Sequence, residues 1–149
     1  MLLTRTRAST FFVTALVLPC GIAAAQSSGD NPLANSKAFP YEQMRVKTAA
    51  NGAERRSVAT GTLTTGESVG VRETMLPAGA VPPALHKIQH SEVIVVEQGT
   101  VEFQHDGKAE RVGPGGILYV AFGTMHFVKN VGDTPARYVV IQIGGDTKN

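Results

Sequence analysis

Turn-forming residues recur about every eight to twelve positions from residue 51 onward, and this spacing constrains the fold more than any other feature of the chain. Asn51-Gly52, Asp106-Gly107 and Gly144-Gly145 are three of these points. The runs between them are rich in β-branched and aromatic residues, as strands are: RSVATGTL, SVGVRETML, EVIVVEQ, TVEFQH, ILYVAF, HFVKNV and RYVVIQI. No window of twelve residues shows a helical stripe. The sequence therefore predicts an all-β sandwich or barrel.

The segment TVEFQHDGKAERV indicates one hairpin. Val101 and Phe103 alternate with polar residues, and Asp106-Gly107 suits a two-residue turn whose twist matches that of its strands. His105, beside this turn, is expected to be a solvated turn residue. Tyr119 and Phe122 are expected to pack or to line a pocket rather than to catalyse.

The run EVIVVEQ is apolar on both faces, through Val93 and Val95 on one and Ile94 and Val96 on the other. A strand with one solvated face should alternate instead. One face can fill a core, and the other needs a covering loop, a second layer or another subunit. We favour a homodimer, because closed symmetric dimers are the commonest oligomers.

The first 25 residues have the order of features of a secretory signal peptide. Arg5 and Arg7 precede an apolar run over residues 8–18, which is too short to span a bilayer, and Ala23 to Ala25 provide a cleavage site. We expect cleavage after Ala25 and a soluble protein exported to the periplasm or secreted. Residues 26–41 are polar and contain two prolines, so we expect a flexible lead-in. Residues 42–149 would form one domain.

Charge and cysteine content exclude several functions. Removal of the signal takes away two arginines and leaves 12 basic and 12 acidic residues, so neither nucleic acid nor an anionic membrane is expected as a partner. The single cysteine, Cys20, leaves with the signal. Disulfides, cysteine catalysis and thiolate metal sites are thereby excluded.

The segment LHKIQHSE carries His86, His90 and Glu92. On an unbroken strand these side chains would share one face with Ile88, although a turn near Gln89 would change that parity. A histidine–carboxylate cluster can bind Zn, Mn, Fe or Ni.

This region resembles the first motif of the cupin superfamily, which runs Gly, a gap, His-x-His, three or four residues, Glu, six residues, Gly. His86, Glu92 and Gly99 match it. Ile88 stands in place of the second histidine, and Gly79 lies one residue further from His86 than the pattern prefers.

The segment GPGGILYVAFGTMHFVKN resembles the second cupin motif: Gly, five residues, Pro-x-Gly, two residues, His, three residues, Asn. Gly115, Gly123, His126 and Asn130 match, and Ala121 replaces the proline. The resemblance covers about residues 68–143. It implies a single-domain cupin, a jelly-roll type β-barrel, with Asn130 holding the turn and strand by hydrogen bonds.

The resemblance also implies a metal site, from which Ile88 removes one ligand. His86, Glu92 and His126 would make a two-histidine, one-carboxylate set for a divalent Fe, Mn, Zn or Ni ion, and His90 would be a substitute ligand on a shifted strand. The alternative is a metal-free pocket lined by the same residues. Because Ile88 would make one wall apolar, we expect a small, partly apolar or aromatic ligand.

Three functions stay open. The first is a metal-dependent enzyme, most simply a dioxygenase of the quercetin-dioxygenase-like type, with Glu92 as ligand or base. The second is an exported module that binds a small molecule without metal. The third is a cupin isomerase or epimerase that uses a histidine base. Fold alone does not choose among them.

Overall fold

The computed structural model describes residues 31–145 and 147, which form two antiparallel sheets and one short 3-10 helix, η1 (Tyr41–Gln43). The six-stranded sheet has the order β1-β2-β3-β10-β5-β8. Its strands are β1 (Arg45–Thr48), β2 (Glu54–Thr62), β3 (Ser68–Leu76), β10 (Ala136–Ile143), β5 (Ser91–Gln98) and β8 (Ile117–Val120). The four-stranded sheet has the order β4-β9-β6-β7. Its strands are β4 (His86–Lys87), β9 (Met125–Asn130), β6 (Val101–His105) and β7 (Lys108–Val112).

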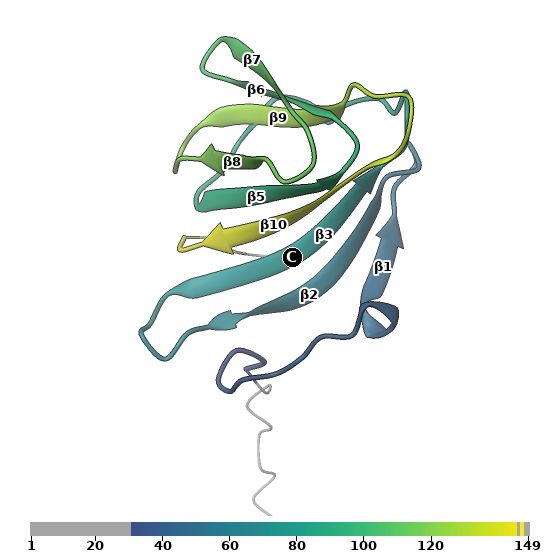
Figure 1. Ribbon diagram of the computed structural model, residues 1–149. Coiled ribbons are helices and arrows are strands. Elements are labelled where there is room, and N and C mark those ends of the chain that lie inside the picture. Colours follow the sequence, from purple (N-terminus) through teal and green to yellow (C-terminus); the bar gives the residue numbers. More distant parts are fainter. Residues whose placement is uncertain (1–30, 146, 148–149) are drawn as a thin grey trace, which may run out of the picture.

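Figure 1 shows the larger sheet fanning from β5 and β10 down to β1, while β6, β7 and β9 lie together above it. This architecture confirms the predicted all-β cupin fold class. The predicted signal peptide, residues 1–25, lies outside the described residues. Among the described residues, the structure contains no helix with the length and hydropathy that a membrane span requires.

The core lies between the two sheets and follows from strand alternation. In β5 the even positions are buried and the odd ones are half-exposed until the last two residues, and β10 alternates in the same way. Val101 and Val120 are completely buried. Burying a side chain of this size stabilises the fold by roughly 1.5–3 kcal/mol.

The predicted hairpin is confirmed. In the β6–β7 pair His105 lies opposite Lys108, which leaves Asp106 and Gly107 as a two-residue turn. Both have positive φ, 47° and 74°, as the favoured hairpin turn requires. His105 differs from the expectation. It ends β6 on the inward parity of Val101 and Phe103, its ring stacks on Phe103 at 4.2 Å, and only 19% of its side chain is exposed.

The segment that precedes β1 contacts the larger sheet at two places. The Asn31 side chain donates to the Thr62 carbonyl at 2.6 Å, and the Tyr41 hydroxyl accepts from Arg137 at 2.8 Å. Arg137 also pairs with the buried Glu73 carboxylate. These contacts hold the segment that precedes β1 against β2 and β10.

The outward side of β5 and β8 remains apolar. Val93 and Val95 are half-exposed, whereas Ile117 and Tyr119 are 66% and 64% exposed. Phe122 is 61% exposed. The expectation that Tyr119 and Phe122 pack or line a pocket is therefore wrong, since Tyr119 falls on the outward parity of β8 and Phe122 lies in the turn that follows it.

Candidate ligand pocket

The segment from Ile88 to Val96 keeps one inward parity as the chain enters the larger sheet, whereas His86, at the start of β4, is exposed. His86 belongs to β4 in the smaller sheet and Glu92 to β5 in the larger sheet. Between them Ile88 and His90 are buried, whereas Lys87 and Gln89 are exposed. The turn that could have reversed the parity does not do so. The first motif therefore contributes to both walls of the barrel.

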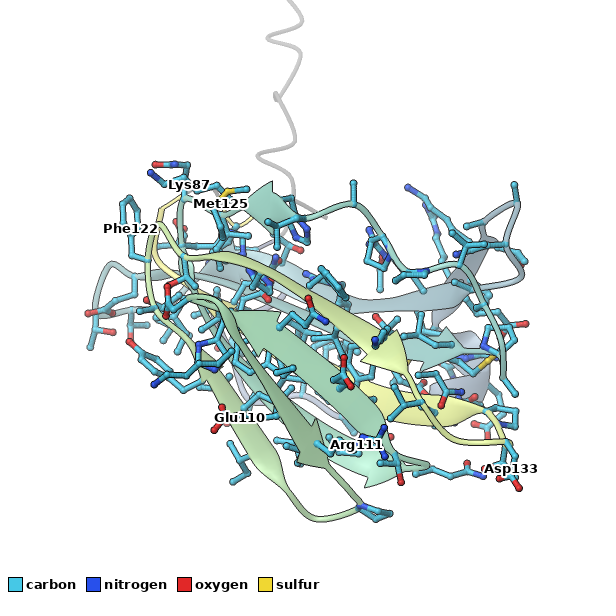
Figure 2. All side chains as sticks on the ribbon, turned by 90° about the horizontal axis from the view of Figure 1, so that it is seen from above. Lys87, Glu110, Arg111, Phe122, Met125 and Asp133 are labelled. Atoms are coloured by element: carbon cyan, nitrogen blue, oxygen red, sulfur yellow. The ribbon has the colours of Figure 1, made fainter. Side chains whose placement is uncertain are left out.

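His86 and His126 form a pair across the two sequence motifs. They are opposite each other in the β4–β9 ladder, and their ring centroids lie 4.7 Å apart. The His86 Nδ1 atom is 3.1 Å from the Ala84 carbonyl, and the His126 Nδ1 atom is 3.3 Å from the Thr124 carbonyl. Each ring is thus oriented by its own backbone through Nδ1, and the Nε2 atom of the buried His126 faces Glu92. Lys87 and Met125, the next pair in this ladder, lie at the same end of the molecule as Phe122 (Figure 2).

Glu92 is the centre of a buried polar network. Its Oε1 atom accepts from Arg72 at 3.2 Å and from Gln142 at 3.1 Å, and it lies 3.0 Å from His90 Nε2. His126 Nε2 lies 3.6 Å from the other oxygen, Oε2. Burial alone would raise the pKa of Glu92, but His126, the positive charge of Arg72, His90 and Gln142 together hold this pKa well below its ordinary value. Glu92 is therefore an ionised, charge-compensated carboxylate.

Cross-strand register explains how distant residues reach Glu92. Gln142 lies opposite Gly70 on one side and Glu92 on the other, so the three form one row across β3, β10 and β5. A Cβ atom at Gly70 would come within 2.8 Å of Gln142 Oε1. A glycine at this position thus gives the Gln142 amide room to turn toward Glu92 and His90.

As arranged, these donors do not fit a transition metal ion. Within residues 31–145 and 147, no set of three or more His, Cys, Asp or Glu side chains is arranged to hold a metal. One Glu92 oxygen is already engaged by Arg72, His90 and Gln142. Ile88 is only 7% exposed and belongs to the apolar core. Metal ligation by His86, His90, Glu92 and His126 stays a prediction, which a metal titration can test.

Three of the four predicted site residues line one small cavity between the sheets, and His90 supports Glu92 from outside it. The volume of this inner cavity is about 50 Å³. Its lining consists of Arg55, Arg72, Thr74, Pro83, His86, Glu92, Ile94, His126, Val128, Tyr138 and Val140. Ile88 is not part of this lining, so the predicted apolar wall does not come from that residue.

A larger outer cleft of about 420 Å³ adjoins the inner cavity. The two spaces share four lining residues, Arg55, Thr74, Pro83 and Tyr138. The outer cleft is completed by Lys47, Thr48, Ala49, Asn51, Ala53 and Leu76. Its volume is typical of a small-molecule site, whereas the inner cavity has room for one small polar group. Burial raises the pKa of Tyr138 to about 12, although Arg72 and Arg55 oppose this rise, so its hydroxyl stays protonated at neutral pH.

The pocket contains functional residues that the motifs do not reveal. Arg72 and Thr74 share the strand parity of Gly70 and Leu76, which are buried, and Arg55 lies opposite Thr74 in the β2–β3 ladder. An arginine on the inward parity of a strand is the signal that could have indicated Arg72. Asn130 was predicted to be structural, and this is confirmed: its amide nitrogen donates to the Leu76 and Thr134 carbonyls at 3.0 and 2.7 Å.

Residues 71–142 match the family model described as a cupin domain. Over these residues the chain is similar to cupin domains. The match spans β3 to β10 and includes both motif histidines of the pocket, His86 and His126. A comparison with curated proteins finds no match.

Solved structures agree with this fold. An RmlC-like cupin from Shewanella frigidimarina superposes with a TM-score of 0.60 and 20% sequence identity, covering 74% of this chain and 94% of the other. A protein from Thermotoga maritima described as a predicted oxalate decarboxylase gives 0.58 and 19%, covering 72% and 98%. A protein from Silicibacter pomeroyi described as a sugar phosphate isomerase gives 0.59 and 16%, covering 76% of each chain. At these identities the likeness extends to the fold alone.

Proposed function

We propose that this cupin binds a small organic molecule in the pocket between its sheets and does so without a transition metal. The observation that carries the proposal is the engagement of Glu92. A carboxylate already paired with Arg72 and hydrogen-bonded by Gln142 is a poor metal ligand, because an ion would have to displace these donors and leave a cation buried beside it.

The network also gives the pocket a defined shape. Glu92 is 3% exposed and His126 is 3% exposed, so their contacts are shielded from water. Mutual hydrogen bonds orient the members of this network, although Arg72 Nε and Gln142 Oε1 remain without a partner in the described part of the chain. A ligand entering from the outer cleft would meet an inner wall whose polar groups are already oriented. Such preorganisation favours binding, since little ordering remains to be done.

A proton-transferring isomerase or epimerase is the second candidate. It is favoured by the orientation of His86 and His126, whose Nδ1 atoms are held by backbone carbonyls while both rings line the inner cavity. An imidazole held in this way can take a proton at Nε2 from a bound substrate. The protonated hydroxyl of Tyr138, in the same lining, can donate to an oxygen on that substrate.

Metal content decides between the proposed metal-free binding function and a metal-dependent dioxygenase. Untagged protein would be purified without chelator, analysed for metals and titrated calorimetrically with Mn, Fe(II), Zn and Ni. We expect less than about a tenth of an equivalent in the purified protein, and the same content in His126→Ala. One equivalent of metal that His126→Ala loses, but that the control variant His105→Gln retains, would overturn the proposal. Oxygen uptake with catechols and flavonols would then test the dioxygenase.

We also propose that two copies of this chain pair through the outward side of β5 and β8. The exposed Ile117 and Tyr119 and the half-exposed Val93 and Val95 support this face, and β8 is an edge strand of its sheet. Sedimentation at micromolar concentration should give twice the chain mass, and the double variant Ile117→Lys, Tyr119→Lys should give the mass of one chain. A monomeric parent protein would refute the pairing.

Export remains a proposal that rests on the sequence of residues 1–25. Expression of the full chain in a bacterial host, followed by fractionation and N-terminal sequencing, should place a form that begins at Gln26 in the periplasm or the medium. Full-length protein in the cytoplasm would refute it.

A further inference from the structure

The charges that line the two adjoining cavities are unbalanced. Lys47, Arg55 and Arg72 contribute three cations, whereas Glu92 is the one carboxylate in the two linings. Glu92 is already paired with Arg72, at 3.2 Å. Lys47 and Arg55 therefore remain as the uncompensated charge of this pocket.

These two cations have no acidic partner in the described part of the chain. No carboxylate there lies within 4.0 Å of the Lys47 ammonium or of the Arg55 guanidinium. The neighbouring arginines, Arg56 and Arg137, are paired, because both contact the Glu73 carboxylate. Two unpaired cations beside a concave cleft favour an anion in that cleft.

Strand register holds the cations next to two hydroxyl groups. Lys47 lies opposite Arg55, Arg55 opposite Thr74, and Thr74 opposite Tyr138, which makes one row across β1, β2, β3 and β10. Side chains that lie opposite each other on one face of a sheet are about 5 Å apart at Cβ. All four residues line the outer cleft, and Arg55, Thr74 and Tyr138 also line the inner cavity.

One further donor near this row lacks a partner. The Nε atom of Arg72 is buried and makes no hydrogen bond, although its Nη2 atom binds Glu92. A buried N–H group without an acceptor destabilises the fold, because it has lost its hydrogen bond to water. An oxygen atom placed in the inner cavity, which Arg72 lines, is an acceptor for that group.

We propose that the pocket binds a small organic carboxylate, with its carboxyl group at the junction of the two cavities beside Arg55. This inference deepens the proposed function and rests on it. The carboxylate oxygens pair with the Arg55 guanidinium, whose planar fork matches them, and Lys47 adds a second positive charge at the cleft. The rest of the molecule lies in the outer cleft against Ala53, Leu76 and Pro83. The inner cavity, at about 50 Å³, admits no more than a group of carboxyl size.

Matched acids and amides test this assignment. The ¹⁵N-labelled chain, stripped of metal with EDTA and then exchanged into chelator-free buffer, would be titrated with benzoate, benzamide, hexanoate, hexanamide and phenyl phosphate, and dissociation constants would be taken from amide chemical shifts. We expect each acid to bind at least tenfold more tightly than its amide, with the largest shifts at residues 47–55, 72–76 and 138. Equal affinities for acid and amide would overturn the proposal. Phenyl phosphate binding tenfold more tightly than benzoate would also overturn it, in favour of a phosphate ester.

Charge variants supply the controls. Arg55→Met should weaken benzoate binding at least tenfold, and Arg55→Lys should recover part of the loss. Arg111→Met removes the same charge from β7, a strand that contributes no residue to either lining and on which this side chain is 72% exposed, and it should leave the constant unchanged. An unchanged constant in Arg55→Met with a native spectrum refutes the assignment.

Removal of metal before the acid titration separates the two proposals. If the metal titrations find a tight site while the stripped protein still binds benzoate through Arg55, the metal-free function fails and the carboxylate assignment stands. If neither metal nor acid binds, the carboxylate assignment fails alone.

Discussion

Replacing Arg72 with Met should destabilise the fold by about 2–3 kcal/mol at pH 7.5. Removing one partner of a fully buried ion pair costs about 3–5 kcal/mol, whereas an exposed pair contributes about 0–1 kcal/mol. Arg72 lies between these limits: its side chain is 19% exposed, whereas the carboxylate it binds at 3.2 Å, Glu92, is 3% exposed. His90 and Gln142 still support that carboxylate, which places the cost below the buried limit. Methionine retains the apolar part of the arginine side chain, so the loss reports mainly on charge.

Urea denaturation measures this loss. For a domain of this size, 2–3 kcal/mol corresponds to a fall of about 1–2 M in the unfolding midpoint. Arg111→Met is the matched control, because its side chain is 72% exposed and its Nε lies 3.8 Å from Glu102, and it should shift stability by less than about 0.5 kcal/mol.

The pH dependence gives a second, independent check. The pKa of Glu92 is lowered in the folded protein, so this residue stabilises the fold fully above its unfolded pKa of about 4.3 and progressively less as pH falls toward the folded value. Without Arg72, the pKa of Glu92 in the folded protein should rise toward its value in the unfolded chain. The gap between parent and variant should therefore be largest above pH 5 and narrow below pH 4. A loss under about 0.5 kcal/mol at pH 7.5, or a gap that is constant from pH 7.5 to 3.5, would refute the role assigned to the Arg72–Glu92 pair.

Three further perturbations follow from the structure. Asn130→Ala removes two donated hydrogen bonds and one accepted from the Gly132 amide at 2.9 Å, and should cost about 2–4 kcal/mol by urea denaturation; a cost below 1 kcal/mol would contradict its bracing role. Gly99 and Gly107 both have φ of 74°, but a Cβ at Gly99 would lie 2.7 Å from the Ala136 backbone, whereas the space around Gly107 is open. Gly99→Ala should therefore lower the melting temperature by several degrees more than Gly107→Ala, and equal shifts would show that strain in φ alone matters. Hydrogen bonds to the neighbouring carboxylates raise the pKa of His105, so its positive charge stabilises the fold at low pH and this contribution is lost as pH rises through the folded pKa. The loss of stability in His105→Gln should therefore be larger at pH 5.5 than at pH 9. The reverse order would contradict the pairing.

The fold was predictable because its signals are local. Turn spacing and the Asp106-Gly107 hairpin follow from a few neighbouring residues, whereas the inward parity of β5 does not, because its sequence is apolar on both faces. The proximity of His86, Glu92 and His126 was also predicted, although it was inferred from the resemblance to known motifs and not from periodicity. In the structure these three residues line one cavity.

The chemistry of the site was not predictable in the same way, because it depends on non-local register. Arg72 reaches Glu92 since β10 lies between β3 and β5, an order that no local pattern in the sequence specifies. The same is true of the row that joins Lys47 to Tyr138. That Ile88 marks a lost ligand position stays a prediction, and its place in the core rather than in the cavity wall depends on how the chain crosses between the sheets.

That crossing has a consequence for how the protein responds to its ligand. His86 and Glu92 are six residues apart in sequence and stand on opposite sheets, with the inner cavity between them. A ligand bound in this cavity contacts both sheets. Ligand binding and global unfolding are therefore thermodynamically linked. Each tenfold excess of free ligand over its dissociation constant adds about 1.4 kcal/mol to the free energy of unfolding. The shift in melting temperature caused by each member of a library of small acids is thus a direct way to identify the ligand of this pocket.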